Sequence, residues 1–338
     1  MCVLNRRCYA WISIAGLEGC LRNPSTWLDS RRIPCYQPID QSSVYIDREN
    51  ESLVCVRNLS HGALGNIDLA VYRKDGEEKY VYVKRPIIVG QSLLQEAAIQ
   101  QLVSLRLDDN GFINGASRVL CVFALRDRSV GFAMEPIQGA VTFDRYLNSI
   151  SDECLPNAIL DCLVQLCAIG WYLDQQLGVN HRDLSPCNFM VVDHSPRIKI
   201  LTIENEIIDL SSSRSLTLID FGFSCIGDRE THVADLSLST VYPKNDPCPK
   251  EGRDLYLFLG LLYIDYHSRF PPQLHSLFES WLQPKFCKFM RSERESAKQW
   301  LYVMVGNSSI TRLRIGPVQV INDLEVIRGV GRDEHKES

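Results

Sequence analysis

The feature that most constrains this chain is a ten-residue stretch, Val179–Asn188, which reads VNHRDLSPCN. In it Asp183 follows a His-Arg pair, and Asn188 lies five positions further on. A second acidic turn, Asp220-Phe221-Gly222, follows the strand-like run Leu216–Ile219. Either turn alone is equally well explained as a solvated charged loop or a chance β-turn. Both in this order, each beside an apolar run, favour a functional site.

The two motifs resemble the H-R-D-L-x-x-x-N catalytic loop and the D-F-G turn of eukaryotic-type protein kinases. The resemblance implies ATP as the phosphoryl donor and Mg²⁺ bridging its phosphates. It gives Asp183 the role of orienting and deprotonating the attacking hydroxyl, and it makes Asn188 and Asp220 the oxygen ligands of the metal. The implied fold is α+β and bilobal, with a small β-rich N-lobe and a mainly α-helical, shortened C-lobe.

A strand-like pattern near Leu53 runs into SHGALGNI, Ser60–Ile67. Two glycines between strands indicate a hairpin and nothing more. Placed before a lysine strand, the segment resembles the kinase glycine-rich loop, whose glycines let backbone N–H groups approach the phosphates without a Cβ in the way. The resemblance implies a nucleotide-binding role for Ser60 in the first glycine place, for Gly62 and Gly65, and for Ile67.

The lysine strand is the alternating run Tyr80–Lys84, similar to the V-A-I-K element of kinases. By this resemblance Lys84 reaches the α- and β-phosphates and pairs with a glutamate on the next helix. The candidate is Glu96, in the helical segment Leu93–Ile99. Two features depart from the family pattern. Glu96 follows Lys84 by only twelve residues, and Gln100 stands where an apolar residue is expected.

Two further strand patterns, Val119–Leu125 and Ser129–Met134, lead into a segment that resembles the kinase hinge. There the carbonyl of Glu135 and the N–H of Ile137 are expected to bind adenine. Pro136 has no N–H, but it occupies the one position whose N–H the adenine does not use.

The second half of the chain is predicted to be mainly helical. Apolar residues recur at three- and four-residue spacing over Ile159–Leu177, which predicts an amphipathic helix leading to the catalytic loop. A surface hairpin insertion is expected over His194–Arg214. A buried helix is expected from Gly252, with Asp254 accepting hydrogen bonds from the catalytic-loop backbone. Later helices are expected over Leu274–Leu282 and Ala297–Met304.

No Ala-Pro-Glu triplet follows the Asp-Phe-Gly turn. The long insertion and the missing triplet are similar to haspin-like kinases and to divergent kinases of large DNA viruses. The expected organisation is an N-terminal extension of unknown role over residues 1–51, an N-lobe over 52–137, a C-lobe over 138–325 and a disordered charged tail over 326–338.

The composition is that of an ordinary globular protein, with 45% hydrophobic and 23% charged residues in 338. A net charge of −5 argues against nucleic-acid binding through bulk electrostatics. The 13 cysteines are scattered, which predicts neither a zinc site nor a disulfide framework and favours a reducing compartment. No apolar run reaches the roughly 18 residues of a membrane span. The expected location is the cytoplasm, or the host-cell cytoplasm or virion for a viral protein.

Three functions remain open from the sequence. The first is an active protein kinase acting on an unidentified protein substrate. The second is a pseudokinase, a nucleotide-binding scaffold, which the imperfect glycine loop, Gln100 and the missing Ala-Pro-Glu favour. The third is a small-molecule kinase of the same fold. Ser185 stands where serine/threonine kinases carry a lysine, yet Pro186 and the general pattern favour serine or threonine acceptors.

A regulatory phosphorylation is also expected from the resemblance. Arg182 would pair with a phosphorylated residue of the activation segment. The candidates are Thr231, Ser237 and Thr240, and the sequence does not separate them.

Overall fold

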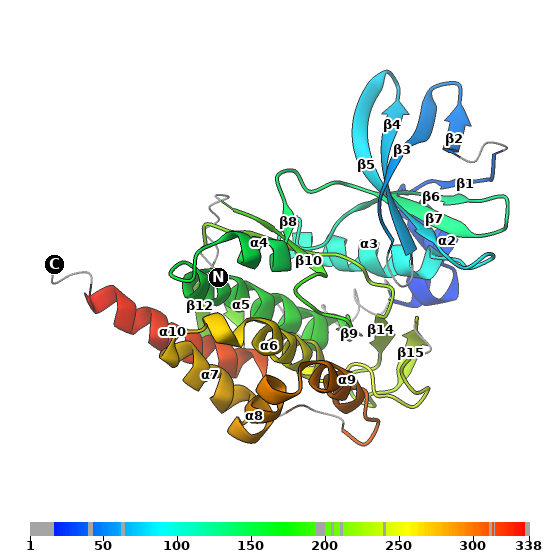
Figure 1. Cartoon of the computed structure of the whole chain (residues 1–338). Helices are drawn as coiled ribbons and strands as arrows, with labels where there is room; N and C mark the ends of the chain where they lie inside the picture. The colour runs from blue at the N-terminus through cyan, green and yellow to red at the C-terminus, as the bar shows by residue number, and fades with distance from the viewer. Residues whose placement is uncertain are drawn as a thin grey trace, which may run out of the picture. The chain divides into compact units, whose positions relative to one another are not determined.

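The computed structural model describes residues 17–39, 43–61, 65–193, 200–203, 206–209, 212–238, 241–310, 313 and 315–334. The chain divides into two compact units. Unit 1 comprises Met1–Gln138 together with Ile219–Gly222, and unit 2 comprises Gly139–Leu218 and Phe223–Ser338. Unit 1 is built on a large β-sheet and unit 2 mainly on helices (Figure 1). The predicted mixed α+β class is confirmed at this level.

The sheet of unit 1 has seven strands in the order β1-β6-β7-β5-β4-β3-β2. Neighbouring strands run antiparallel, except that β1 pairs with β6 in parallel. The strands predicted from alternation are confirmed. The bounds are β1 Cys35–Tyr36, β2 Val44–Arg48, β3 Glu51–His61, β4 Gly65–Lys74, β5 Glu77–Pro86, β6 Val119–Ala124 and β7 Val130–Met134.

Part of the predicted N-terminal extension belongs to this sheet. Strands β1 and β2 form its two edges, and the short helix α2, Pro24–Ser30, packs near the long helix α3, Leu94–Asp109. A helical segment also covers residues 17–22, while Trp11, Ile12 and Ile14 lie outside the described residues. Separating residues 1–51 from the sheet was therefore wrong for 35–48. The repeated prolines suggested an irregular segment, and the strands β1 and β2 are too short to show a clear alternation of apolar and polar residues.

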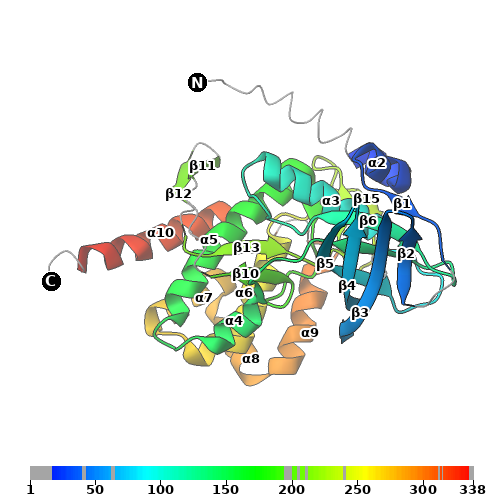
Figure 2. The same cartoon turned by 90° about the horizontal axis from the view of Figure 1, so that it is seen from above.

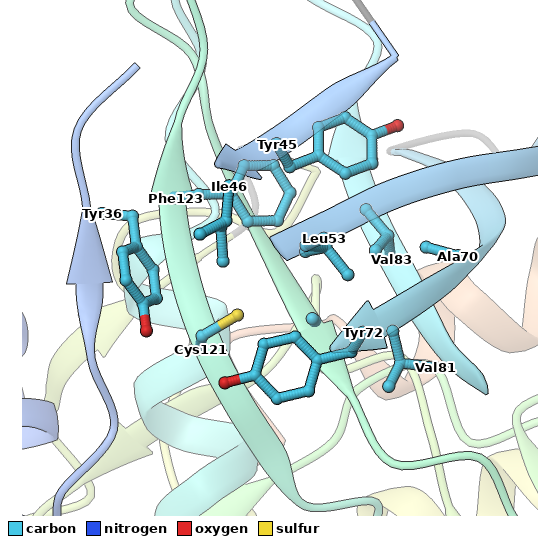
Figure 3. Close-up of a cluster of buried hydrophobic side chains, with 11 residues drawn as sticks. Tyr36, Tyr45, Ile46, Leu53, Ala70, Tyr72, Val81, Val83, Cys121 and Phe123 are labelled. Carbon is cyan, nitrogen blue, oxygen red and sulfur yellow. The ribbon is translucent and has the colours of Figure 1, made fainter. Parts of the chain in front are cut away.

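One apolar cluster of unit 1 is formed where residues of several strands of the sheet meet (Figure 3). The rings of Tyr45 and Phe123 stack with centroids 4.7 Å apart, joining the edge strand β2 to β6. The cluster comprises Tyr36, Tyr45, Ile46, Leu53, Ala70, Tyr72, Val81, Val83, Cys121, Phe123 and Ala133.

A buried carboxylate, Asp68, holds the strands around the glycine-rich loop. Asp68 lies on β4 and is fully buried. Its Oδ2 accepts hydrogen bonds from the Tyr45 hydroxyl at 2.7 Å and from the Arg85 guanidinium. Its Oδ1 accepts one from the Asn58 amide at 2.9 Å. These three partners come from β2, β5 and β3, so one carboxylate joins four strands.

Helix α3 packs against β6 and β7 and carries two buried glutamines on that side. Gln100 donates to the carbonyl of Ser117 at 2.9 Å, and Gln101 accepts from the N–H of Val119 at 2.9 Å. Gln100 is therefore a satisfied buried amide that fixes the start of β6, and its polarity does not weaken the packing of α3.

Unit 2 is built around the buried helix α6, which packs against α5, α7, α8 and α9, while α10 runs alongside α5 (Figure 2). The predicted helices are confirmed. Their bounds are α4 Phe143–Ser149, α5 Leu155–Tyr172 with a π-helical end Leu173–Leu177, α6 Arg253–Tyr266 with a 3₁₀ turn His267–Arg269, α7 Pro272–Leu282, α8 Pro284–Ser292, α9 Arg294–Val305 and α10 Pro317–Glu334.

The tail predicted to be disordered from residue 326 is helical as far as Glu334, because α10 continues into it. The charged composition of the tail did not reveal a helix that starts in an apolar segment. The continuous stretch Leu155–Leu177 is also long and apolar enough to cross a membrane, with a mean hydropathy of 1.2 over its best window and 61% of that window buried. Core helices of globular proteins meet the same criterion.

Short strands in unit 2 position the two motif loops. One sheet has the order β13-β10-β8 and another the order β15-β14-β9, and β11 pairs with β12 as the predicted hairpin insertion. The bounds are β8 Val141–Thr142, β9 Val179–Asn180, β10 Phe189–Val192, β11 Ile200–Ile203, β12 Glu206–Asp209, β13 Ser215–Leu218, β14 Cys225–Gly227 and β15 Ala234–Ser237. The catalytic-loop stretch lies between β9 and β10.

One pair of cysteines forms a disulfide, Cys225–Cys248, with a sequence separation of 23. Both cysteines are fully buried. The expectation that scattered cysteines leave the chain without disulfides was wrong for this pair, because only the folded path of the segment after the Asp-Phe-Gly turn brings them together.

The Asp68 network predicts an acid-sensitive stability of unit 1. Burial raises the pKa of Asp68, but the hydrogen bonds from Arg85, Tyr45 and Asn58 outweigh burial and lower that pKa overall. Because the folded-state pKa lies below the unfolded value of about 3.9, the contribution is present above that pH and is lost as pH falls below it. We expect Asp68→Asn to lower the free energy of unfolding by about 2–3 kcal/mol at neutral pH.

Urea unfolding from pH 7 to pH 3 measures this contribution. The difference between wild type and Asp68→Asn should shrink as pH falls through the range below about 4. A difference that stays constant down to pH 3 would show that the Asp68 carboxylate is not the group responsible. Asp47→Asn, at an exposed position of β2, is the control and should match wild type throughout.

Candidate active site

Three of the predicted site residues meet in unit 1. The ammonium of Lys84 lies 2.5 Å from a carboxylate oxygen of Glu96 and 2.7 Å from Oδ1 of Asp220. Lys84 and Glu96 are both 3% exposed, while Asp220 is 40% exposed. The predicted pairing of Lys84 with Glu96 is therefore observed despite the short spacing. The exposed part of Asp220 is the side of the cluster that a ligand can reach.

The backbone of the sheet explains why Lys84 takes this position. On β5 the side chains of Val81 and Val83 enter the apolar core, so the period of two turns Lys84 to the other face, toward Glu96 of α3. Gly65 leaves room for its side chain and Gly131 for its backbone carbonyl. A Cβ at Gly65 would lie 3.0 Å from Cε of Lys84, and a Cβ at Gly131 would lie 2.8 Å from its carbonyl oxygen.

Neighbouring charges outweigh burial in setting the pKa of Lys84, whereas burial prevails for Glu96, whose pKa is raised overall. Burial alone lowers the pKa of Lys84, but Glu96 and Asp220 together raise it above its ordinary value. The ammonium is therefore charged at neutral pH. Burial raises the pKa of Glu96, and Lys84 opposes that shift. The cluster thus places a fixed positive charge beside a partly exposed carboxylate.

The Asp-Phe-Gly turn belongs to the same unit as Lys84. Asp220 has a positive φ of 64°, a conformation that costs of order 1–3 kcal/mol and persists only where neighbouring contacts enforce it. The contacts are the ion pair to Lys84 and a hydrogen bond at 3.3 Å from the N–H of Gly222 to Asp220 Oδ1. Phe221 is fully buried. Strain enforced in this way is characteristic of functional sites.

The structure places the other predicted nucleotide-binding residues of unit 1 around the β3–β4 hairpin and after β7. Ser60 is the penultimate residue of β3 and pairs with Ile67 of β4, while Gly65 pairs with Pro86. Gly62 lies outside the described residues. Gly65 therefore has a role that the sequence did not show, because its missing Cβ makes room for the side chain of Lys84.

The segment predicted to bind adenine follows β7. The N–H of Glu135 donates to the carbonyl of Arg118 at 2.9 Å, and the carbonyl of Glu135 accepts from the Ser117 hydroxyl at 2.9 Å. A carbonyl oxygen has two lone pairs, so this contact leaves capacity for a second donor. Ile137 is partly buried and lies in a segment without regular secondary structure.

The remaining predicted residues meet in unit 2. The amide nitrogen of Asn188 donates to the carbonyl of Asp183 at 2.7 Å and to its Oδ2 at 2.9 Å. The hydroxyl of Tyr302, on α9, donates to Asp183 Oδ1 at 2.7 Å. Because the nitrogen of Asn188 makes both bonds to Asp183, its amide oxygen is directed to the opposite side of the planar group. An amide oxygen is a ligand that Mg²⁺ accepts.

The backbone of the catalytic-loop stretch is fixed by Asp254, as the sequence predicts. Its two carboxylate oxygens accept hydrogen bonds from the N–H groups of His181 and Arg182, both at 2.7 Å. Arg182 has a positive φ of 67°, and the hydroxyl of Tyr242 donates to its carbonyl at 2.6 Å. The backbone next to Asp183 is thus fixed through its N–H groups by Asp254 and through a carbonyl by Tyr242.

The side chain of Arg182 already has an acidic partner. It lies 2.9 Å from a carboxylate oxygen of Asp246 and donates to the hydroxyl of Ser237 at 2.5 Å. Asp246 also pairs with Lys250 at 3.0 Å and with Arg253 at 2.5 Å. Burial and Arg253 lower the pKa of Arg182 to about 10 and that of Lys250 to about 8.

Of the three candidate phosphorylation sites, the structure sets Ser237 apart through its contact with Arg182. Thr231 instead bonds to Asp228 in an exposed turn, and Thr240 lies outside the described residues. Sequence reasoning missed both Asp246 and Tyr302, because neither lies in a local motif and each reaches its partner only through tertiary folding.

Comparison with known proteins gives limited information. No protein-family model matches the sequence, and no curated protein matches it. Among solved structures, the chain is similar to the crystal structure of the BubR1 kinase domain, with a TM-score of 0.46 and 15% sequence identity, over 100% of this chain and 97% of that one. Likeness of this degree carries no functional inference, so the chemistry of the site rests on the distances above.

The buried Lys84–Glu96 pair predicts strong energetic coupling within unit 1. Removing one partner leaves the other buried without its counter-charge, which costs about 3–5 kcal/mol in such pairs. We expect Lys84→Met to lower the free energy of unfolding by about 3 kcal/mol and Glu96→Gln by about 2 kcal/mol, because Asp220 still accompanies the lysine in the second variant. The double variant should lose less than the sum.

Urea unfolding of the four proteins gives the coupling directly. Lys79→Met is the matched control, because Lys79 lies on the same strand and is 50% exposed. It should stay within about 0.5 kcal/mol of wild type. Additive losses in the double variant would contradict a direct Lys84–Glu96 interaction.

Proposed function

We propose that this protein is an ATP-dependent protein kinase that transfers the γ-phosphate of ATP to protein hydroxyls, with serine and threonine as the acceptors. The observation that carries the proposal is the cluster of Lys84 with Glu96 and Asp220. Lys84 and Asp220 are separated by 136 positions in the sequence, yet their side chains lie 2.7 Å apart. A charged lysine beside a partly exposed carboxylate suits a site for a magnesium–triphosphate.

Each residue of the cluster has a distinct part in binding the nucleotide. The ammonium of Lys84 pairs with the α- and β-phosphates, and Glu96 keeps that ammonium charged and oriented. Asp220 and Asn188 supply oxygen atoms for Mg²⁺, consistent with the partial exposure of Asp220 and the direction of the Asn188 amide. Bound Mg²⁺ supplies neutralisation of the negative charge on the phosphate oxygens.

The transfer step falls to Asp183. Its carboxylate orients the acceptor hydroxyl and takes its proton, while the acceptor oxygen forms a bond to the γ-phosphorus and the bond from that phosphorus to the bridging oxygen of ADP breaks. Asp254 and Asn188 hold Asp183 in place through the hydrogen bonds described above. A fixed base is the arrangement that this reaction requires.

Two observations favour an active enzyme over a pseudokinase. Gln100 is a satisfied buried residue of α3, so it does not indicate a degraded lysine–glutamate site. A Cβ at Gly65 would press on the side chain of Lys84 at 3.0 Å, so glycine at this position supports a maintained nucleotide site. A small-molecule kinase of the same fold is the alternative, and the complete His-Arg-Asp sequence favours the protein kinase. Pro186 favours serine and threonine, although Ser185 replaces the usual lysine.

Two aspartates separate nucleotide binding from transfer. We expect Asp220→Asn to abolish transfer and to weaken Mg²⁺-dependent ATP binding, because it removes a metal-binding charge. We expect Asp183→Asn to leave ATP affinity within a few-fold and to lower kcat by roughly 10²–10⁴, the usual contribution of a positioned general base.

The measurements are ATP affinity by calorimetry, with and without Mg²⁺, and transfer of labelled phosphate to a mixture of generic proteins, followed by phosphoamino-acid analysis. Asp109→Asn, an exposed residue at the end of α3, is the matched control and should behave as wild type. If wild-type protein binds Mg²⁺-ATP but labels no protein, the kinase proposal fails and the scaffold takes its place. Label found only on a small molecule would favour the alternative enzyme.

A further inference from the structure

The hydroxyl of Tyr302 contacts the proposed base, Asp183, and has no role in the mechanism proposed above. It donates a 2.7 Å hydrogen bond to Oδ1 of Asp183, from a helix 119 positions further along the chain. The other carboxylate oxygen of Asp183, Oδ2, accepts from Asn188. Both oxygens of the proposed base therefore have fixed donors, and one of these donors lies outside the catalytic loop.

Helix α9 holds Tyr302 rigidly. On its buried side Ala297, Leu301 and Val305 follow at four-residue spacing and are each fully buried. α9 packs closely on α6, because a Cβ at Gly260 would lie 2.7 Å from the side chain of Leu301. Tyr302 follows Leu301 on this anchored helix and is partly buried. The hydroxyl of Tyr302 is thus held in position by a packed helix and not by a loop.

The ionisation of Tyr302 makes it a permanent donor. Burial, together with the nearby Asp183 carboxylate, raises the pKa of Tyr302 above its ordinary value of about 10. The phenol is therefore neutral throughout the physiological range and keeps its proton for the bond to Asp183. A hydrogen bond from a buried donor to a charged carboxylate is stronger than one between neutral groups.

We propose that Tyr302 is a positioning residue that fixes the orientation of the Asp183 carboxylate for proton transfer. The proposal rests on the kinase function proposed above. Between Tyr302 on Oδ1 and Asn188 on Oδ2, the carboxylate cannot rotate about its Cβ–Cγ bond without losing two hydrogen bonds. Each carboxylate oxygen has further lone pairs, so Oδ1 can still accept a bond from an incoming acceptor hydroxyl. Tyr302 therefore acts through Asp183 and does not itself exchange a proton.

The test is the substitution Tyr302→Phe, which removes the hydroxyl and keeps the ring. Loss of a hydrogen bond to a charged group should lower kcat by roughly 10- to 100-fold. The KM for ATP should stay within about twofold, because the hydrogen bond of Tyr302 goes to Asp183, which is proposed to contact the acceptor and not the nucleotide. Tyr266→Phe is the matched control, since its hydroxyl donates to the carbonyl of Asp144 at 3.1 Å and lies outside the proposed machinery. It should leave kcat unchanged.

A double-mutant cycle separates positioning from a structural role. If Tyr302 acts only through Asp183, Tyr302→Phe should have no further effect on kcat in the Asp183→Asn background. An equal loss in both backgrounds, or a loss matched by Tyr266→Phe, would show that Tyr302 is merely structural and would overturn the proposal.

Four other results would also overturn it. A rise of kcat in Tyr302→Phe would mean that the phenol obstructs the acceptor. Phosphate found on Tyr302 by mass spectrometry of wild-type protein incubated with Mg²⁺-ATP would make it an acceptor. A wild-type protein that transfers no phosphate to any acceptor would remove both this inference and the kinase function. Normal transfer by Tyr302→Phe would remove the inference alone.

Discussion

The ion cluster of Lys84, Glu96 and Asp220 is the interaction on which unit 1 depends most. A lysine that is 3% exposed can remain charged only if its desolvation is offset by opposite charges at short distance. Glu96 and Asp220 supply those charges, so the sheet and α3 must bring the three side chains together. The side chain of Lys84 on β5 points away from the apolar cluster, and Gly65 and Gly131 leave space for its side chain and its carbonyl. Helix α3 places the Glu96 carboxylate 2.5 Å from the ammonium.

The four residues Ile219–Gly222 belong to unit 1 although their neighbours in sequence belong to unit 2. The ion pair gives a physical reason for that.

In unit 2, buried and partly buried polar groups hold the loop that carries Asp183. Asp254 on α6 binds two consecutive backbone N–H groups, and Asn188 and Tyr302 bind the Asp183 side chain. α6 is buried along nearly its whole length, so its carboxylate is a rigid support. Unit 1 thus contains a buried lysine with two acidic partners, and unit 2 contains a carboxylate with a fixed orientation.

Local motifs were sufficient to predict most of the strands and helices and nearly all the residues of these two clusters. The alternation of Tyr80–Lys84 located β5, and the His-Arg-Asp and Asp-Phe-Gly triplets located Asp183 and Asp220. These features are visible because each is set by neighbours within a few residues. The strands β1 and β2 were missed because neither has a clear alternation of apolar and polar residues; β1 is defined by its pairing with the distant strand β6, and β2 by its pairing with β3. The Cys225–Cys248 bond was missed for the same reason.

The partner of Arg182 shows why the remaining features escaped the sequence. The arginine of the His-Arg-Asp motif was expected to pair with a phosphorylated residue. The sequence does not indicate that Asp246 is its partner in the fold. In the fold, Arg182, Lys250 and Arg253 all converge on the Asp246 carboxylate, and all four side chains are buried. Burial and the neighbouring Arg253 lower the pKa of Arg182 and of Lys250, while Asp246 opposes both shifts. The sequence could not show this arrangement, because Asp246 reaches Arg182 only through the folded path of the segment after the Asp-Phe-Gly turn.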